Sequence, residues 1–401
     1  MGAIRDAGFG CVAQQAQSAE RLLAVEDTTS ASYAHAAAAR LGGTGSQREA
    51  RHRGYLVHSV LLLDATREHT LGLIEQRHWC RDDAEYGKKH ARKQRAYEDK
   101  ESYQWEQASV RMAARLGEAM ARTISVCDRE SDVYEYLSYK QQQGHRFILR
   151  AQSDRGVSQA EQTLFATLTQ EAQALCCYTV DIAQRAGRRA RQAKLLLRSL
   201  RVELQPPANR SRKGAPLTVN VVLAQEIDPV PGEDALRWIL LTTEPVSSAE
   251  HALQVVRYYE LRWRIEEYHK AWKSGVGVER QRFQSPENLE RMLVITAFLA
   301  VRLLQLREHV DAPVESESAR SCDTVLTQEQ WRVLWHSSER HPLPDTPPSL
   351  RWACLAIAKL GGFANTKRTG RPGWDTLWHG WARLQKRVEG YQIAKQMAKQ
   401  M

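Results

Sequence analysis

Residues 22–27 read LLAVED and residues 123–128 read TISVCD. Each stretch is a run of apolar and β-branched residues that finishes in an aspartate, which predicts a buried strand in both places. If the two strands are parallel neighbours, Asp27 and Asp128 lie side by side at one sheet edge. Adjacent carboxylates repel each other unless a cation lies between them, so the pair indicates a metal site. The alternative is that each aspartate only caps a turn, which is common at strand ends.

A third stretch, RYYELRWRIEEYHKAWK at residues 257–273, has the period of an amphipathic helix. On such a helix one stripe is apolar, and it consists of Leu261, Ile265, Tyr268 and Trp272. A separate face gathers a phenol, a guanidinium, a carboxylate and an amine, from Tyr259, Arg262, Glu266 and Lys273. A solvated surface can carry the same residues, but aromatic and basic groups around one glutamate also suit a metal ligand beside a phosphodiester.

The chain has 401 residues and a net charge of +10, from 57 basic and 47 acidic side chains. A basic surplus favours polyanionic partners, with nucleic acid first and an anionic membrane surface second. No apolar run approaches the roughly 20 residues of a membrane-spanning helix, and no signal peptide is visible. The seven cysteines form no CxxC pair and the 13 histidines have no zinc-site spacing. We therefore expect a cytoplasmic protein with no membrane contact and no zinc.

The pattern of apolar and polar residues divides the rest of the chain into predicted strands, helices and a β-rich region. Residues 54–65 and 70–79 predict two strands that form an antiparallel meander with the first strand. Residues 1–20 predict weak structure, and residues 106–121 a helix. Short β-rich runs separated by turn residues predict an inserted β domain over residues 153–247. Helical patterns return at residues 248–306 and 349–397, on both sides of a polar, proline-containing stretch.

The spacing Tyr259-x2-Arg262-x3-Glu266-x6-Lys273 is the YREK signature of the insertion-sequence-four family of bacterial DDE transposases. The segments LLAVEDTTSASY, ISVCDRESDVYEYL and LGGFANTKRTG also resemble that family, and the resemblance runs from about Ile4 to the end. It implies an α/β fold with a ribonuclease-H-like catalytic core, interrupted by an inserted β domain and followed by a C-terminal helical region. The expected parts are a remnant N-terminal segment (1–20), the first part of the core (21–152), the inserted β domain (153–247), the second part of the core with the YREK helix (248–309), and a helical dimerisation region (310–401).

The resemblance also implies a function, namely cut-and-paste DNA transposition by hydrolysis, hairpin formation and strand transfer. Its catalytic triad would be Asp27, Asp128 and Glu266, which would bind two Mg²⁺ ions about 3.5–4 Å apart. Mn²⁺ is expected to substitute for Mg²⁺. Contacts to DNA are implied for Arg150, Trp238, Tyr259, Arg262, Lys270 and Lys273. Trp238 would stack on a flipped base, and its alternative is a core position in a β hairpin.

The expected partners are double-stranded DNA, as transposon ends and target, and a second copy of the chain. The homodimer would form in the DNA complex through C-terminal helices, where aromatic and apolar residues from Trp374 to Tyr391 recur at helical spacing. The alternative is that these residues pack in the core of the chain itself. Bound to DNA, the protein would be associated with the bacterial nucleoid. Basic runs at Arg185–Lys194 and Arg210–Lys213 either face solvent or follow the DNA backbone. The basic insertion at 84–98 has no clear counterpart in the family.

Members of the family begin with a DNA-binding domain of several dozen residues, whereas about 20 residues precede Arg21 here. Two hypotheses follow: an active Mg²⁺-dependent transposase, and an N-terminally truncated, non-catalytic regulator that dimerises with full-length transposase. Without the base-reading domain, we expect weak, salt-sensitive DNA binding with little sequence preference. A third hypothesis, a ribonuclease-H-type hydrolase of RNA–DNA hybrids, fits the core alone, but the YREK helix and the β insertion argue against it.

Overall fold

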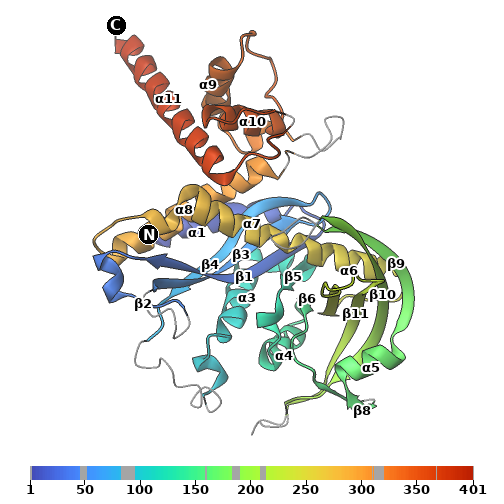
Figure 1. Ribbon diagram of the computed structural model, residues 1–401. Coiled ribbons are helices and arrows are strands. Elements are labelled where there is room, and N and C mark those ends of the chain that lie inside the picture. The colour runs from blue at the N-terminus through green and yellow to red at the C-terminus, as the bar shows by residue number, and fades with distance from the viewer. Residues whose placement is uncertain are drawn as a thin grey trace.

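The computed structural model describes the following residues: 2–45, 52–82, 95–158, 160–182, 190–207, 214–308, 310, 320–366 and 368–400. It is a mixed α/β structure in which helices cover both faces of one large sheet, and the last helices lie beyond α8 (Figure 1). Of the basic segments noted in the sequence, Arg210–Lys213 lies outside the described residues, as do residues 84–94 of the insertion and residues 185–189 of the run Arg185–Lys194.

The strands that carry the two aspartates lie next to each other in the centre of the sheet. β1 (Leu22–Tyr33) pairs in parallel with β5 (Thr123–Cys127), which pairs in parallel with β6 (Arg146–Arg150). On its other side β1 pairs antiparallel with β3 (Arg53–Asp64), and β3 pairs antiparallel with β4 (His69–Trp79). The predicted meander and the predicted parallel pair are both confirmed.

The predicted end of the first strand is wrong. β1 does not finish at Asp27 but continues through Thr28 and Ser30 to Tyr33, so Asp27 lies in the middle of the strand opposite Ser59. Threonine favours extended backbone, and β3 supplies a hydrogen-bonding partner along the whole extension. Asp128, by contrast, directly follows the last residue of β5, as predicted.

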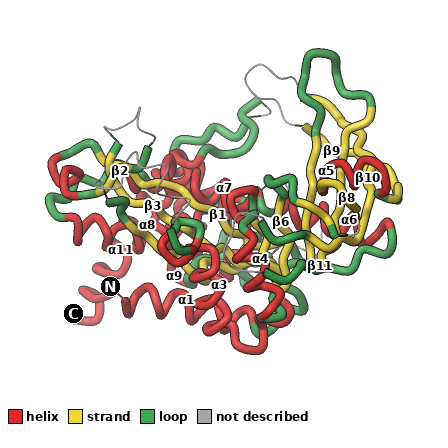
Figure 2. Tube along the Cα trace, turned by 90° about the horizontal axis from the view of Figure 1, so that it is seen from below, coloured by secondary structure: helices red, strands yellow, loops and turns green. Residues whose placement is uncertain are grey.

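The strands between residues 153 and 247 continue the same sheet. β12 (Arg237–Thr242) pairs antiparallel with β6, and β11 (Leu217–Ile227), β10 (Arg191–Leu204) and β9 (Gln173–Ile182) follow in turn. Figure 2 shows these strands gathered with α5 (Leu164–Glu171) at one end of the molecule. Their β character is confirmed, whereas their assignment as a separate inserted domain stays a prediction. Three short strands complete the described sheet: β2 (Gly42–Gly43), β7 (Gly156–Val157) and β8 (Ala160–Thr163).

The N-terminal segment was expected to be weakly structured, and this expectation is wrong. Residues Gly2–Ala16 form helix α1, whose Phe9, Val12 and Ala16 are buried against β4 and α3. Alanine is the best helix former, and four of these 15 residues are alanine. The remaining helices of this half are α3 (Tyr103–Leu116), α4 (Tyr134–Gln142) and the 3₁₀ turns η1 (Ala36–Arg40), η4 (Tyr97–Asp99), η5 (Gly117–Arg122) and η6 (Arg129–Ser131).

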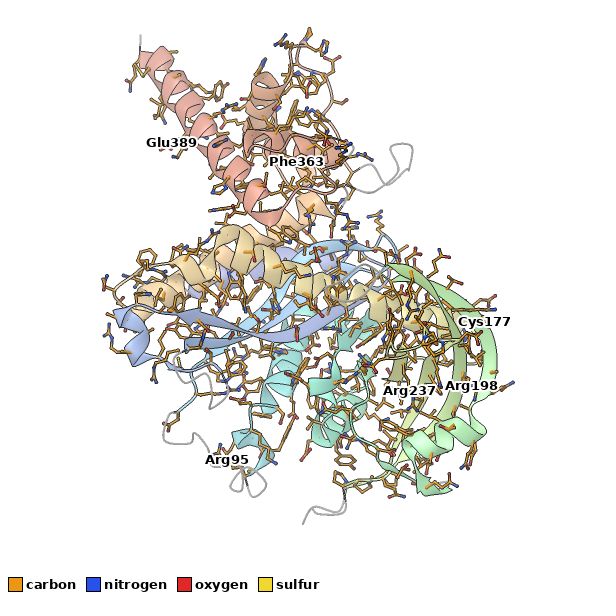
Figure 3. The ribbon with its side chains drawn as sticks, viewed as in Figure 1. Arg95, Cys177, Arg198, Arg237, Phe363 and Glu389 are labelled. Atoms are coloured by element: carbon orange, nitrogen blue, oxygen red, sulfur yellow. The ribbon has the colours of Figure 1, made fainter. Side chains whose placement is uncertain are left out.

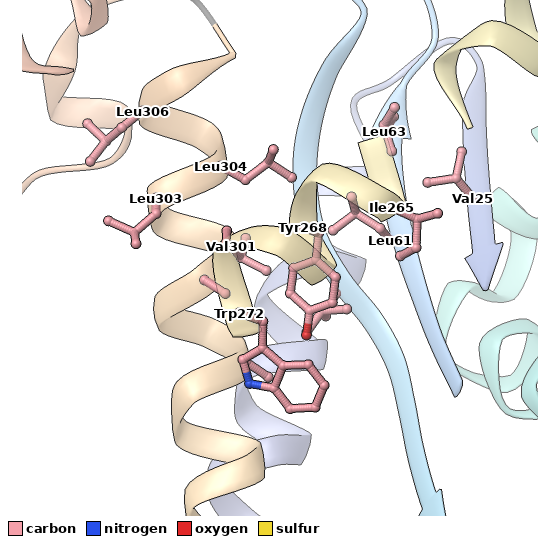
Figure 4. Packing of buried hydrophobic residues seen from close by; sticks show 14 of the residues in the cluster. Val25, Leu61, Leu63, Ile265, Tyr268, Trp272, Val301, Leu303, Leu304 and Leu306 are labelled. Carbon is pink, nitrogen blue, oxygen red and sulfur yellow. The ribbon is translucent and has the colours of Figure 1, made fainter. Parts of the chain in front are cut away.

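The stretch from 257 to 273 is helical, but it is not one straight helix. α6 (Ala249–Leu261) ends at a turn on Arg262, α7 (Trp263–Lys270) follows, and η7 (Ala271–Val276) is a π-helix. The predicted apolar stripe is nevertheless buried, and Figure 4 shows Ile265, Tyr268 and Trp272 between the sheet and α8 (Pro286–Arg307). A 3₁₀ turn, η8 (Val278–Arg280), leads into α8.

The C-terminal part contains α9 (Gln328–Ser338), α10 (Leu350–Leu360), α11 (Trp374–Gln400) and the turn η9 (Cys322–Thr324). α9 was not expected in the polar stretch, although Thr327 and Gln330 form a capping box at its start. The first half of α11 is packed, but its end points away from the molecule (Figure 1) and Tyr391 is 48% exposed. Among the described helices, none has the length and apolar character needed to cross a membrane.

Candidate active site

Asp27 and Asp128 meet at neighbouring positions of β1 and β5. The parallel register pairs Val25 with Val126, and continuing it by two residues brings Asp27 opposite Asp128. Asp128 caps the turn η6, where its Oδ1 accepts a hydrogen bond of 2.9 Å from the backbone N–H of Glu130. The turn-capping alternative is therefore correct for Asp128, but it leaves the second carboxylate oxygen of this residue for other partners.

The other two predicted triad residues act on the charge of Asp27. Burial and, after it, the negative charge of Asp128 raise the pKa of Asp27 from 3.8 to about 7. Glu266 also contributes to raising this pKa, while Arg262 and a backbone hydrogen bond lower it. Since electrostatic effects of this kind fall off with distance, the three carboxylates share one environment.

Arg262 compensates part of this negative charge. It lies at the turn between α6 and α7, and its Nη2 donates a 2.8 Å hydrogen bond to Glu266 Oε1. The guanidinium carbon also lies 5.8 Å from the centre of the Tyr259 ring. Burial by itself would lower the pKa of Arg262, but Tyr259, Asp27 and Glu266 together raise it. The guanidinium is thus a fixed cation beside the acidic residues.

Lys273 lies in the π-helix η7 and also faces the acidic residues. Burial lowers the pKa of Lys273, while Glu279 and Asp27 act in the opposite direction. Glu279 Oε1 in turn accepts a 2.9 Å hydrogen bond from the backbone N–H of Ser32 in β1. Single π-turns occur frequently at functional sites, and this one leaves the Lys273 amine within the field of Asp27.

His269 belongs to this cluster, and the sequence interpretation missed it. Its Nδ1 lies 3.6 Å from Asp27 Oδ2. Burial lowers the pKa of His269 to about 3, and Lys273 and Arg262 contribute to the decrease. The ring is therefore neutral at physiological pH. The sequence did contain a signal for His269, because a residue three positions after Glu266 lies on the same helical face.

The predicted DNA contacts divide into two groups. Arg150, Trp238 and Tyr259 form a continuous row with Arg262, in which the rings of Trp238 and Tyr259 lie 5.7 Å apart at 60°. Arg150 ends β6, and its Nη2 donates a 3.0 Å hydrogen bond to the carbonyl of Arg237, which is labelled in Figure 3. Trp238 is half-buried against the core, so both interpretations of this residue stay open.

Lys270 is placed differently from the rest. It is exposed, its Nζ donates a 3.0 Å hydrogen bond to Glu267 Oε1, and it lies 4.8 Å from the centre of the Trp263 ring. Trp263 is also exposed, whereas Arg262 and Lys273 are close to the carboxylates. Lys270 is accordingly available to a ligand that lies along the outside of the helix.

The donor set suits a divalent cation, although the side chains are not arranged around one. Among the described residues, no group of three or more His, Cys, Asp or Glu side chains is in position to hold a metal ion. Glu266 is instead bonded to Arg262. Mg²⁺ and Mn²⁺ prefer carboxylate oxygens, and a bound cation would offset both the burial of Asp27 and its repulsion by Asp128, which together raise its pKa.

The raised pKa of Asp27 predicts a pH-dependent stability of the metal-free protein. The raised pKa means that the folded protein holds the Asp27 proton more tightly than the unfolded chain. The stabilising contribution is therefore full below pH 3.8 and is lost as the pH rises through about 7. At 1.36 kcal/mol per pH unit, the loss reaches at most about 4 kcal/mol. Asp27→Asn should raise Tm in EDTA, with the largest gain over wild type at pH 8 and a small one at pH 4. A gain that shrinks with rising pH would contradict the assigned environment.

The comparison with known protein families identifies the family of the chain. The family model described as "Transposase DDE domain" matches residues 57–302. The match includes Asp128, Glu266 and all six predicted DNA-contacting residues, while Asp27 lies ahead of it. The mixed α/β architecture, with a central sheet covered by helices, fits such a domain. Because the match covers more than half of the 401 residues, the chain belongs to the DDE transposase family.

Proposed function

We propose that this protein is a cut-and-paste DNA transposase of the insertion-sequence-four family, with motifs very similar to those of the transposase of transposon Tn-five. Asp27, Asp128 and Glu266 would be the catalytic residues. The observation that carries the proposal is the parallel register of β1 and β5, which brings Asp27 opposite Asp128, with the Arg262–Glu266 ion pair close enough to affect the pKa of Asp27. The YREK spacing and the family match support the same function.

The residues around the triad suit a phosphodiester substrate. Arg262 and Lys273 supply cations whose pKa values respond to Asp27, and Tyr259 supplies a hydroxyl that interacts with Arg150, Arg262 and Asp128. Arg150 and Arg262 would bind the DNA backbone and hold the scissile phosphate against the carboxylates. Two divalent cations held by the triad would activate the attacking oxygen and stabilise the leaving oxygen.

A direct test uses duplex oligonucleotides that carry the inverted repeats flanking the coding sequence. The full chain should nick these ends with Mg²⁺ or Mn²⁺ and should not do so with EDTA. The second hypothesis, a regulator that dimerises with another transposase copy, predicts the reverse. In that case the chain would not cleave with either metal, yet would lower cleavage by an active transposase mixed with it.

The residues of α11 expected at a dimer contact are mostly core residues, because Trp381, Leu384 and Val388 are buried within the chain. The proposed homodimer would instead use the exposed end of α11, which begins at Tyr391. Tyr391, Ile393 and Met397 are 48%, 52% and 61% exposed on this helix. Large apolar side chains that gather on an exposed surface commonly mark an interaction site.

A separate prediction concerns Trp238. If its ring stacks on an extruded base, Trp238→Ala should slow hairpin formation by about 10- to 100-fold, because such stacking is worth about 1–3 kcal/mol. First-strand nicking should change far less, and Trp238→Phe should retain most of the hairpin step. Denaturing gels that separate nicked, hairpin and cleaved products measure both steps. An equal loss of both steps in Trp238→Ala would instead indicate that the ring mainly supports Tyr259.

A further inference from the structure

The helix that carries Glu266 is short and irregular at both ends. α7 has eight residues, follows the turn at Arg262, and runs into the π-helix η7. Neither neighbour continues it as a regular α-helix, so neither alone fixes its rotation about the helix axis. That rotation decides where the Glu266 carboxylate lies relative to Asp27 and Asp128. The contacts on the sides of α7 must therefore contribute to setting it.

Two ion pairs connect α7 to the end of α8. In one of them the cation belongs to α8, and in the other it belongs to α7. Arg307 Nη1 lies 2.7 Å from Glu267 Oε2, and Arg264 Nη1 lies 3.7 Å from Glu308 Oε2. Arg264 and Glu267 lie on either side of Glu266 in the sequence, whereas Arg307 and Glu308 are consecutive. We call these four residues the crossed ion pairs. Because each helix contributes one cation and one anion, sliding or rotating α7 would bring like charges together.

The crossed ion pairs are themselves held firmly. The Arg307 guanidinium lies 4.2 Å from the centre of the Trp374 ring, and its Nε donates a 3.0 Å hydrogen bond to the carbonyl of Pro372. Glu308 accepts hydrogen bonds from the Thr70 backbone at 3.1 Å and from the Thr70 hydroxyl at 2.8 Å. Arg307 is thus anchored at the start of α11, and Glu308 at the start of β4. Trp374 also packs against Gly275 in η7. Its Cβ lies 3.3 Å from the point that a Cβ would occupy if Gly275 had a side chain.

The apolar contacts of the same helices hold α7 in place but are less directional. Ile265 and Tyr268 are buried between the sheet and the side of α8 that carries Val301 and Leu304 (Figure 4). Burial of apolar surface is non-directional, so it fixes how close the helices lie better than it fixes the rotation of one of them. Ion pairs with defined geometry add the rotational restraint.

We propose that the crossed ion pairs position the Glu266 carboxylate for metal binding, and that Arg307, held by Trp374 and Pro372, is the principal positioning residue. The proposal rests on the proposed function, in which Glu266 is a metal ligand. Arg307 thereby links the start of the C-terminal helix α11 to the catalytic helix, in addition to the direct packing of Trp374 on η7. Removing a group that orients a metal ligand typically weakens metal affinity by about 10- to 100-fold.

The experiment measures Mn²⁺ binding by the full chain without DNA, from the electron paramagnetic resonance signal of the free ion. Arg307→Met should bind Mn²⁺ about tenfold more weakly than wild type, and Arg307→Lys should recover part of the loss because it keeps the charge beside Glu267. Arg257→Met is the matched control, since Arg257 forms an ion pair with Glu68 that anchors the neighbouring helix α6. This control should bind Mn²⁺ within about twofold of wild type.

Cleavage of the same variants provides the second measurement. In Arg307→Met the Mn²⁺ concentration for half-maximal cleavage should rise about tenfold, and the rate at saturating Mn²⁺ should return towards wild type. Wild-type Mn²⁺ affinity in both Arg307 variants would overturn the proposal, as would an equal loss in Arg257→Met. Glu266→Gln distinguishes a failure of the proposed function from a failure of the positioning role of Arg307. If it too binds Mn²⁺ like wild type, the proposed function fails; if it alone loses Mn²⁺, only the positioning role fails.

Discussion

Asp27→Asn, Asp128→Asn and Glu266→Gln should each lower metal-dependent cleavage of transposon ends by at least about 1000-fold. A bound cation contributes several kcal/mol of charge stabilisation in the transition state, and each 1.36 kcal/mol corresponds to about a tenfold change in rate. The three variants keep the size of the side chain and remove only its charge. Single-turnover nicking of labelled duplex ends in Mg²⁺ and in Mn²⁺ measures the loss.

Folding must be followed alongside this loss, and the expected changes differ between the variants. Asp27→Asn should be more stable than wild type in EDTA, because it removes a buried, repelled charge. Glu266→Gln removes the partner of Arg262, so its stability should be equal or slightly lower. Asp181→Asn, an exposed carboxylate on β9, is the matched control and should cleave like wild type. Wild-type nicking by any of the three triad variants would remove that residue from the catalytic assignment.

The strand pattern was readable from the sequence because it depends on local composition. The run Thr123–Cys127 became β5 with the predicted bounds, and Asp128 follows it as expected. The end of β1 was not readable. Residues after Asp27 stay extended because β3 pairs with them, and that partner is distant in the sequence.

The helix around Glu266 shows a second limit of the sequence pattern. A period of 3.6 residues predicted the buried stripe correctly, but it could not reveal the turn at Arg262 or the π-turn that carries Lys273. Both irregularities depend on tertiary packing, as do the contacts between Glu267 and Arg307, which are 40 residues apart. The sequence of α9 contains the residues of its capping box, Thr327 and Gln330. The helix was not predicted because the surrounding stretch is polar.

Arg262 leads to the second large expected effect, in which metal binding and cleavage change in opposite directions. In the structure Arg262 bonds the same glutamate that is proposed to bind metal. The guanidinium must release Glu266 before this carboxylate can act as a ligand, and its positive charge opposes a cation close by. Arg262→Gln should therefore bind Mn²⁺ several-fold more tightly than wild type in the absence of DNA. The measurement belongs at pH 8.5, above the pKa of about 7 of Asp27, because losing Arg262 raises that pKa further.

Cleavage by Arg262→Gln should nevertheless fall about 100-fold, which is roughly 2.7 kcal/mol at 1.4 kcal/mol per tenfold change. A charge-assisted hydrogen bond to phosphate accounts for about 1.5–3 kcal/mol, and the loss should include weaker binding of the DNA ends. Arg257→Gln is the matched control, because Arg257 also pairs with glutamates, Glu68 and Glu260, but from the outer surface of α6. If Mn²⁺ affinity falls together with cleavage in Arg262→Gln alone, Arg262 supports the metal ligands rather than competing for Glu266. The guanidinium would then be part of the arrangement that binds metal, and its bond to Glu266 would persist when the cations are bound.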